Sequence, residues 1–106
     1  MRLCDDARVI TEQATLDVLP GREADFEAAF TSAKALIAAS PGFISLQLLR
    51  CIDAPSRYLL LVRWETLESH TEGFRKSARY EDWKALLHHF YDPFPTVEHY
   101  SVIEAT

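Results

Sequence analysis

The sequence predicts a single α+β domain in which two helices pack on one face of a four-stranded antiparallel sheet. Three observations lead to this prediction. Four segments are rich in β-branched and aromatic residues, two longer segments space their apolar residues three or four positions apart, and turn-forming residues separate these segments. Their order along the chain is βαββαβ, which is the ferredoxin-like arrangement. A length of 106 residues suits one domain.

The first strand and the first helix occupy the N-terminal third of the chain. Residues 8–19 are rich in β-branched side chains and end at Pro20-Gly21, a turn signal. Helical spacing follows until Ser-Pro-Gly at 40–42, which ends the helix. The apolar positions of this helix are Phe26, Ala29, Phe30, Ala33, Leu36 and Ile37.

A hairpin is predicted next, because two apolar runs are joined by a short turn. The runs are residues 43–52 and 57–65, and Asp-Ala-Pro-Ser at 53–56 forms the turn. The fourth strand is predicted at residues 96–105, where β-branched residues alternate with polar ones.

The segment between the third and fourth strands is predicted to be helical, in two pieces. The stretch from Trp64 to Phe90 contains both tryptophans and three of the four histidines. The bend between the pieces is expected at Gly73 or around residues 77–79, and the prolines of Asp-Pro-Phe-Pro at 92–95 end the segment.

Both faces of the predicted sheet carry apolar side chains. In the third strand, Leu59 and Leu61 alternate with Tyr58, Leu60 and Val62. In the second strand, Ile44, Leu46 and Leu48 are expected to lie opposite Phe43 and Leu49. Two helices cover only one face, so the other face needs a second covering. We therefore expect a homodimer with facing sheets, against the alternative of a monomer with one apolar face.

Composition excludes several classes of protein. The net charge of −5, with scattered basic residues, argues against nucleic-acid or membrane partners. Residues 1–7 are expected to be a polar tail before a domain at 8–105, with no signal peptide, so the expected location is the cytoplasm. Cys4 and Cys51 are too few for a disulfide scaffold. The chain contains no HxxxH metal motif, glycine-rich phosphate loop or GxSxG elbow, so we expect neither metal nor cofactor.

The strand ending LLLVRWETLESH, the following FRKS and the closing PFPTVEHY resemble the antibiotic biosynthesis monooxygenase family. The resemblance spans nearly the whole chain. It implies a dimeric α+β barrel with a pocket between sheet and helices in each subunit. Relatives include cofactor-free oxygenases of polycyclic phenols and quinols, haem-degrading enzymes, and members without known activity.

The chain departs from both groups of enzymes. Haem-degrading relatives use an asparagine on the first strand, and this chain contains none. Phe74 stands where their helical tryptophan falls, and Lys84 lies near the position of their haem-ligand histidine. Quinol-oxidising relatives often carry a histidine where Gly73 stands here, and His70 is one turn earlier. Haem degradation is therefore the least favoured reading.

The candidate site centres on His70. On a helix it shares a stripe with Phe74, and Trp64 enters just before them, which suits a flat aromatic ligand. Histidine is suited to act as the base that forms a phenolate. Arg63 or Arg75 is the expected partner of that anion.

Each of these residues also has a purely structural interpretation. A histidine on an apolar stripe is more often a packing residue, and tryptophan mostly contributes buried area. Tyr80 and Trp83 are candidates for the pocket wall, but their spacing also fits a face packed on the sheet. His88 is expected on a polar face with Glu81 and Lys84. Whether His99 meets a helix histidine is open.

The leading hypothesis is therefore a homodimeric, cofactor-independent monooxygenase with His70 as catalytic residue and Trp64, Phe74, Tyr80 and Trp83 binding a small phenolic or quinol-type substrate. The alternative is a ligand-binding or stress-associated dimer of the same fold without catalysis. A haem-binding protein is the third and weakest hypothesis.

Overall fold

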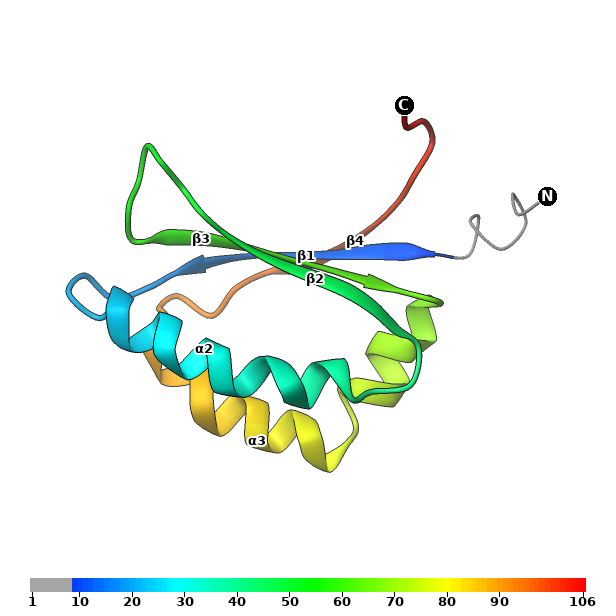
Figure 1. Cartoon of the computed structure of the whole chain (residues 1–106), viewed down its shortest axis with the longest axis horizontal. Coiled ribbons are helices and arrows are strands. Elements are labelled where there is room, and N and C mark those ends of the chain that lie inside the picture. Colours follow the sequence, from blue (N-terminus) through cyan, green and yellow to red (C-terminus); the bar gives the residue numbers. More distant parts are fainter. Residues whose placement is uncertain (1–8) are drawn as a thin grey trace.

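The structure, a computed structural model, describes residues 9–106 and confirms the predicted α+β architecture (Figure 1). The tail expected at residues 1–7, including Cys4, lies outside the described residues. Two helices form one layer beneath the sheet, and the opposite face of the sheet carries no helix (Figure 1). Within residues 9–106, no helix is long and apolar enough to span a bilayer.

The sheet has the strand order β2-β3-β1-β4, and every pairing is antiparallel. The four strands are β1 (Ile10–Asp17), β2 (Phe43–Arg50), β3 (Arg57–Trp64) and β4 (Val97–Ser101). The predicted hairpin is present as the β2–β3 pair. The last strand is shorter than predicted, because it ends at Ser101 and the chain then leaves the sheet.

Helix α2 (Glu23–Ala38) covers the sheet with the predicted stripe, burying Phe26, Phe30, Ala33 and Ile37. The acidic side chains of Glu23 and Asp25 lie in its first turn, where the positive end of the helix dipole stabilises them. It ends before Gly42, whose φ of +87° lies in the left-handed region. A Cβ at Gly42 would also overlap the Ser69 side chain, so this position requires glycine for two reasons.

The predicted two-piece helical segment begins with a π-helical turn at Ser69–Phe74 (η1) and continues as α3 (Ala78–Leu87). Ser77 separates them: its backbone is extended, and its Oγ accepts the Tyr80 N–H, which caps α3. The bend therefore lies in the second of the two predicted places. A short 3₁₀ turn, His88–Phe90 (η2), follows α3.

The two faces of the sheet differ as the alternation predicts. On β3, Tyr58, Leu60, Val62 and Trp64 are buried under the helices, whereas Leu59 and Leu61 lie on the other face. The prediction for Ile44 was wrong. A β-bulge between Phe43 and Ser45 shifts the alternation, so Phe43 packs on the core with Leu46 and Leu48, and Ile44 is exposed.

Candidate functional site

A small cavity lies between the inner face of the sheet and the helices. Its volume is about 40 Å³, which accommodates a few water molecules. Four of the five predicted site residues line it: His70, Phe74, Tyr80 and Trp83. Phe74 meets Tyr80 and Trp83 edge-to-face at 5.5 and 5.8 Å between ring centroids, so these rings form one continuous aromatic wall.

Trp64 is not part of the cavity wall. It is fully buried at the end of β3, and its ring stacks on the His70 imidazole with 5.5 Å between centroids and 19° between planes. The structure therefore places Trp64 behind His70. Trp64 points inward like Leu60, which lines the cavity, but it lies at the far end of β3.

A buried carboxylate, Glu12, stands at the centre of the site. It lies on β1 in the same row as Ala14 and Leu16, and only 5% of its surface is exposed. Its Oε1 accepts the Trp64 Nε1–H at 3.0 Å and lies 3.4 Å from His70 Nε2. Glu12 also lines the cavity. A buried acid held in this way, beside an imidazole, is an arrangement typical of acid–base chemistry.

The π-helical turn presents His70 to this carboxylate. The Arg75 N–H donates to the His70 carbonyl at 2.9 Å, which closes the wide turn. Both His70 and Phe74 are buried by it, and π-type turns recur at functional sites. Thr66 and Ser69 fix the start of the turn, because their side-chain oxygens are 2.9 Å apart and Thr66 Oγ1 accepts the Ser69 N–H.

His99 completes a three-residue arrangement. The register of the β1–β4 pair sets it directly opposite Glu12, and its Nε2 lies 2.8 Å from His70 Nδ1. Unlike the other two, His99 is exposed and does not line the cavity. Among residues 9–106, no group of three histidine, cysteine, aspartate or glutamate side chains is arranged to hold a metal ion.

Burial sets the protonation states of this arrangement. Desolvation, reinforced by the charge of Arg75, lowers the pKa of His70 to about 3, so its imidazole is neutral at neutral pH. Desolvation raises the pKa of Glu12, although the Trp64 hydrogen bond and Arg75 oppose the rise. The 3.4 Å contact between them is therefore not an ion pair at neutral pH.

Of the two arginines considered as anion partners, only Arg75 lies at the site. It lines the cavity, whereas Arg63 is exposed on the outer face of β3. The prediction for His88 was wrong, because it lines the cavity instead of joining the polar face of α3. The chain tightens into η2 at His88, which turns that side chain toward Tyr91 and Phe94.

Glu12 was missed by the sequence reasoning, and the contact of His99 with a helix histidine was left open. A signal for Glu12 exists, since strand periodicity aligns it with Ala14 and Leu16 and leaves a carboxylate in an apolar row. The position of His99 depends on β4 pairing with β1, which its own neighbours do not specify.

Comparison with known proteins agrees with the fold and identifies relatives of the chain. The sequence profile of the antibiotic biosynthesis monooxygenase family matches residues 9–86. The chain is 52% identical over 92 residues to the uncharacterised protein YczJ of Bacillus subtilis (strain 168), covering 87% of this chain and 97% of YczJ.

Solved structures give the same result. A Bordetella bronchiseptica protein named for this family superposes with a TM-score of 0.87 at 39% identity, covering 92% of this chain and 99% of that one. SnoaB, a cofactor-independent oxygenase from Streptomyces nogalater, superposes with a TM-score of 0.82 at 20% identity, covering 93% and 97% of the two chains, and shows the fold alone. The chain therefore belongs to the antibiotic biosynthesis monooxygenase family.

Proposed function

We propose that this protein is a cofactor-independent monooxygenase that oxidises a small phenolic or quinol-type molecule with O2. The observation that carries the proposal is the Glu12–His70 pair, a buried carboxylate and a neutral imidazole on the wall of a largely apolar cavity. Family membership supports the reaction class, and SnoaB shows that this fold can host oxygenation without a cofactor.

The chemistry needs an acid–base pair and an apolar chamber. Loss of the phenolic proton gives an electron-rich phenolate, which can transfer an electron to O2. Recombination gives a peroxide, and breaking its O–O bond leaves one oxygen on the ring as a quinone carbonyl. The second oxygen leaves as water with the phenolic proton and the ring proton, so phenol plus O2 gives quinone plus water. Arg75 faces the same cavity and stabilises the anion.

A fused aromatic substrate needs more room than about 40 Å³. The wall formed by Phe94 and Pro95 is the part that can move. It belongs to the connection between η2 and β4 rather than to a helix or strand, and Phe94 is 61% exposed. Outward displacement of Phe94 enlarges the cavity at its solvent side and leaves the Glu12–His70 pair in place.

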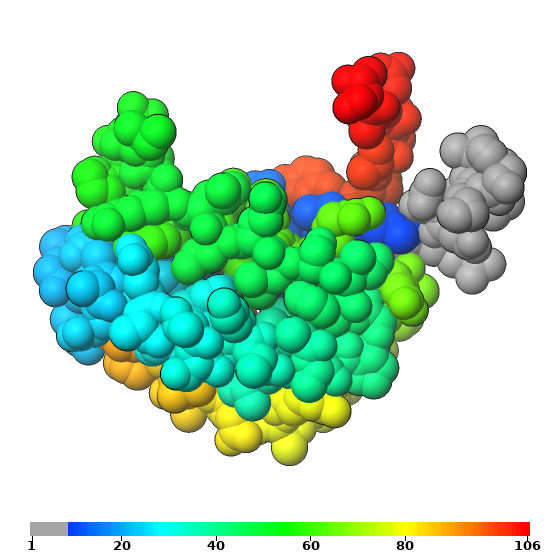
Figure 2. Space-filling view, viewed as in Figure 1, coloured from blue at the N-terminus to red at the C-terminus, as the bar shows by residue number. Residues whose placement is uncertain are grey.

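The proposed functional form is a homodimer that joins the outer faces of two sheets. Leu49 and Leu59 pair across β2 and β3 on this face, and Leu61 lies further along the same row of β3. The β2–β3 loop and the C-terminal segment project beyond the sheet on this side (Figure 2). These two segments contain Ile52 and Ile103, which are 94% and 90% exposed and which a second copy would cover.

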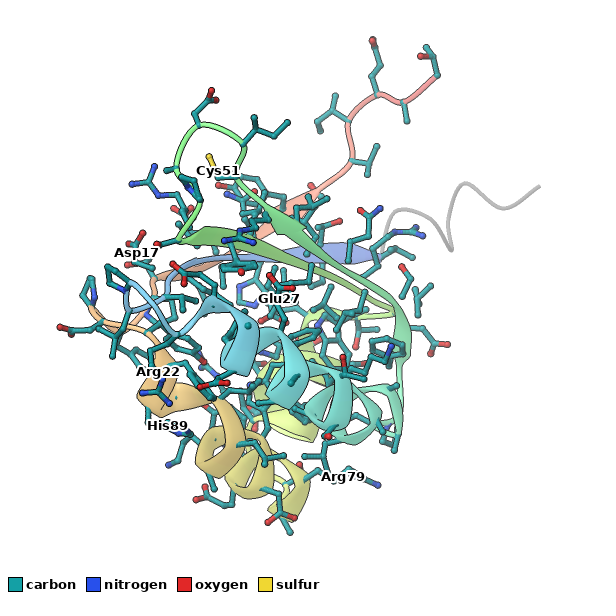
Figure 3. The ribbon with its side chains drawn as sticks, turned by 60° about the vertical axis from the view of Figure 1, so that its left-hand side comes forward. Asp17, Arg22, Glu27, Cys51, Arg79 and His89 are labelled. Carbon is teal, nitrogen blue, oxygen red and sulfur yellow. The ribbon has the colours of Figure 1, made fainter. Side chains whose placement is uncertain are left out.

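Oxygen uptake tests the reaction. The purified protein is incubated with phenols and quinols of one to three fused rings, and dissolved O2 is followed with an electrode. Uptake is expected with at least one substrate, and loss of uptake in His70→Ala. The matched control is His89→Ala, since His89 is exposed on the side of the helical layer away from the sheet (Figure 3). Uptake no faster than in His70→Ala across the whole panel would contradict the proposal.

The small volume of the cavity favours one other function, a dimer that binds a ligand without turning it over. In that case a phenol that binds, as detected by calorimetry, would be recovered unchanged in the presence of O2. The burial of His70 argues against this reading, because a pocket that only binds has no need of a buried acid–base pair.

A further inference from the structure

The two carboxylate oxygens of Glu12 have different surroundings. Oε1 accepts the Trp64 Nε1–H and faces His70 Nε2. No hydrogen bond within residues 9–106 reaches Oε2. In that part of the chain, Ser40 Oγ is the side-chain polar atom that is both fully buried and without a hydrogen-bond partner. Oε2 of Glu12 does not share this state, so it is not fully buried. Glu12 lines the cavity, and Trp64 and His70 both meet it at Oε1, which leaves Oε2 for a bound molecule.

We propose that Glu12 is the catalytic base of the reaction and accepts the phenolic proton at Oε2. Trp64 and His70 are then positioning residues that hold Oε1, and His99 positions His70. This assignment rests on the proposed function, which supplies the phenol. It differs from the expectation that His70 is the base.

The Trp64 indole determines which oxygen takes the proton. An indole N–H can only donate, so Oε1 remains an acceptor whether or not the carboxylate is protonated. A proton gained by Glu12 therefore goes to Oε2. In the transfer the phenolic O–H bond breaks, an O–H bond forms at Oε2, and a phenolate and a neutral carboxyl group remain. The proton returns later to the oxygen that leaves as water.

His99 fixes the tautomer of His70. His70 can direct an N–H from Nε2 toward Glu12 Oε1 only if Nδ1 carries no proton. Nδ1 lies 2.8 Å from His99 Nε2, so His99 donates from Nε2 to Nδ1. A base held by an imidazole, whose orientation is set by a third residue, follows the logic of catalytic triads.

The electrostatics support Glu12 rather than His70 as the acceptor. A pKa near 3 makes the neutral His70 imidazole a weak base. The raised pKa of Glu12 brings it closer to that of a phenol, which favours proton transfer. The other titratable side chains on the cavity wall are Arg75, Tyr80, His88 and Tyr91. Arg75 is the charged group that faces the phenolate.

Ionisation of a bound phenol in the absence of oxygen tests the assignment without turnover. The probe is 1-naphthol, titrated anaerobically with protein at a pH below its own pKa, and the naphtholate absorption band is recorded. Glu12→Gln keeps an acceptor for the Trp64 N–H but cannot take the proton. Glu98→Gln is the matched control, because Glu98 lies on the outer face of β4 and accepts from Tyr100.

We expect the naphtholate band with the native protein and with Glu98→Gln, and its loss with Glu12→Gln while naphthol affinity changes less than a few-fold. In air, Glu12→Gln should lower kcat by about 10²- to 10⁴-fold, the usual contribution of a general base. An undiminished band in Glu12→Gln, or no band with the native protein, would overturn the assignment.

The role of His99 is read from the His70 tautomer by ¹⁵N NMR of the substrate-free protein. His99→Gln keeps an N–H that can donate to Nδ1, whereas His99→Phe does not. The expected result is a single Nε2–H tautomer of His70 in the native protein and in His99→Gln, and its loss together with the naphtholate band in His99→Phe. An unchanged tautomer in a folded His99→Phe protein would refute the positioning role.

The failures of the two proposals are distinguishable. A naphtholate band that depends on Glu12, without oxygen consumption by any substrate, would contradict the monooxygenase function and leave Glu12 as the base. Oxygen consumption that persists in Glu12→Gln would keep the function and remove Glu12 from it.

Discussion

The indole nitrogen of Trp64 donates to Oε1 of Glu12 at 3.0 Å, across the paired strands β3 and β1. Both side chains are buried, so the contact joins a donor and an acceptor that are largely removed from bulk water. A buried polar group that loses its partner bears its full desolvation cost. The core of the protein and the candidate site therefore share this hydrogen bond.

Trp64→Phe tests that bond. It keeps an aromatic ring in the core but removes the indole donor to Oε1, so we expect a loss of about 1–3 kcal/mol in unfolding free energy beyond the cost of the smaller ring. Trp83→Phe is the control, because Trp83 is also buried and no hydrogen bond of its indole is seen in the described part of the chain. Urea unfolding of both variants gives the comparison, and equal losses would contradict the prediction.

Glu12→Gln should change how stability depends on pH above the ordinary carboxyl pKa of 4.5. Burial raises the pKa of Glu12 above its ordinary value of 4.5, so the folded protein holds this proton more tightly than the unfolded chain. Stability from this group is present at low pH and is lost as pH rises through the folded pKa. The variant should therefore gain stability relative to the native protein as the pH rises above about 4.5. A gain of the same size in Glu98→Gln would show that general charge removal causes the effect.

His70→Gln should reduce the loss of stability at acidic pH. The pKa of His70 is lowered from 6.5 to about 3, so between these values the unfolded chain binds a proton that the folded protein does not. The native protein should lose stability as pH falls below about 6.5, by at most about 1.4 kcal/mol per pH unit from this residue. Unfolding at pH 6.5 and pH 4.5 should show a smaller loss for His70→Gln. His89→Gln serves as the exposed control, and equal slopes for all three proteins would refute the prediction.

Leu61→Lys should break the proposed homodimer. It places a charge in the middle of the outer sheet face, where a second copy would bury it without a partner. Light scattering after gel filtration at micromolar concentration should give a dimer mass for the native protein and a monomer mass for the variant. Leu86→Lys is the matched control, since Leu86 is 38% exposed on α3, in the opposite layer. A native monomer, or a variant that remains a dimer, would contradict the proposed interface.

The fold was predictable because its signals are local. The stripe of Phe26, Phe30, Ala33 and Ile37 and the alternation of Tyr58, Leu60 and Val62 each report one face of one element. Where the sequence misled, a local irregularity changed the pattern. The bulge before Ser45 took Ile44 out of the row of Leu46 and Leu48, and the 3₁₀ turn after Leu87 placed His88 in the cavity wall.

The site was only partly predictable, because it depends on contacts between elements. His70 and Phe74 share a helical stripe, and the structure brings both to the cavity. The pairing of His99 with Glu12 comes from the register of β1 with β4, strands at opposite ends of the chain. No periodicity within either strand specifies that register.

The fate of oxygen atoms tests the central claim most directly. The native protein is incubated with a phenolic substrate under ¹⁸O2, and the quinone product is analysed by mass spectrometry. Monooxygenation predicts one ¹⁸O atom in each quinone, formed faster than in Glu12→Gln and in protein-free buffer. Unlabelled quinone, or labelled quinone formed equally fast in all three samples, would contradict the account.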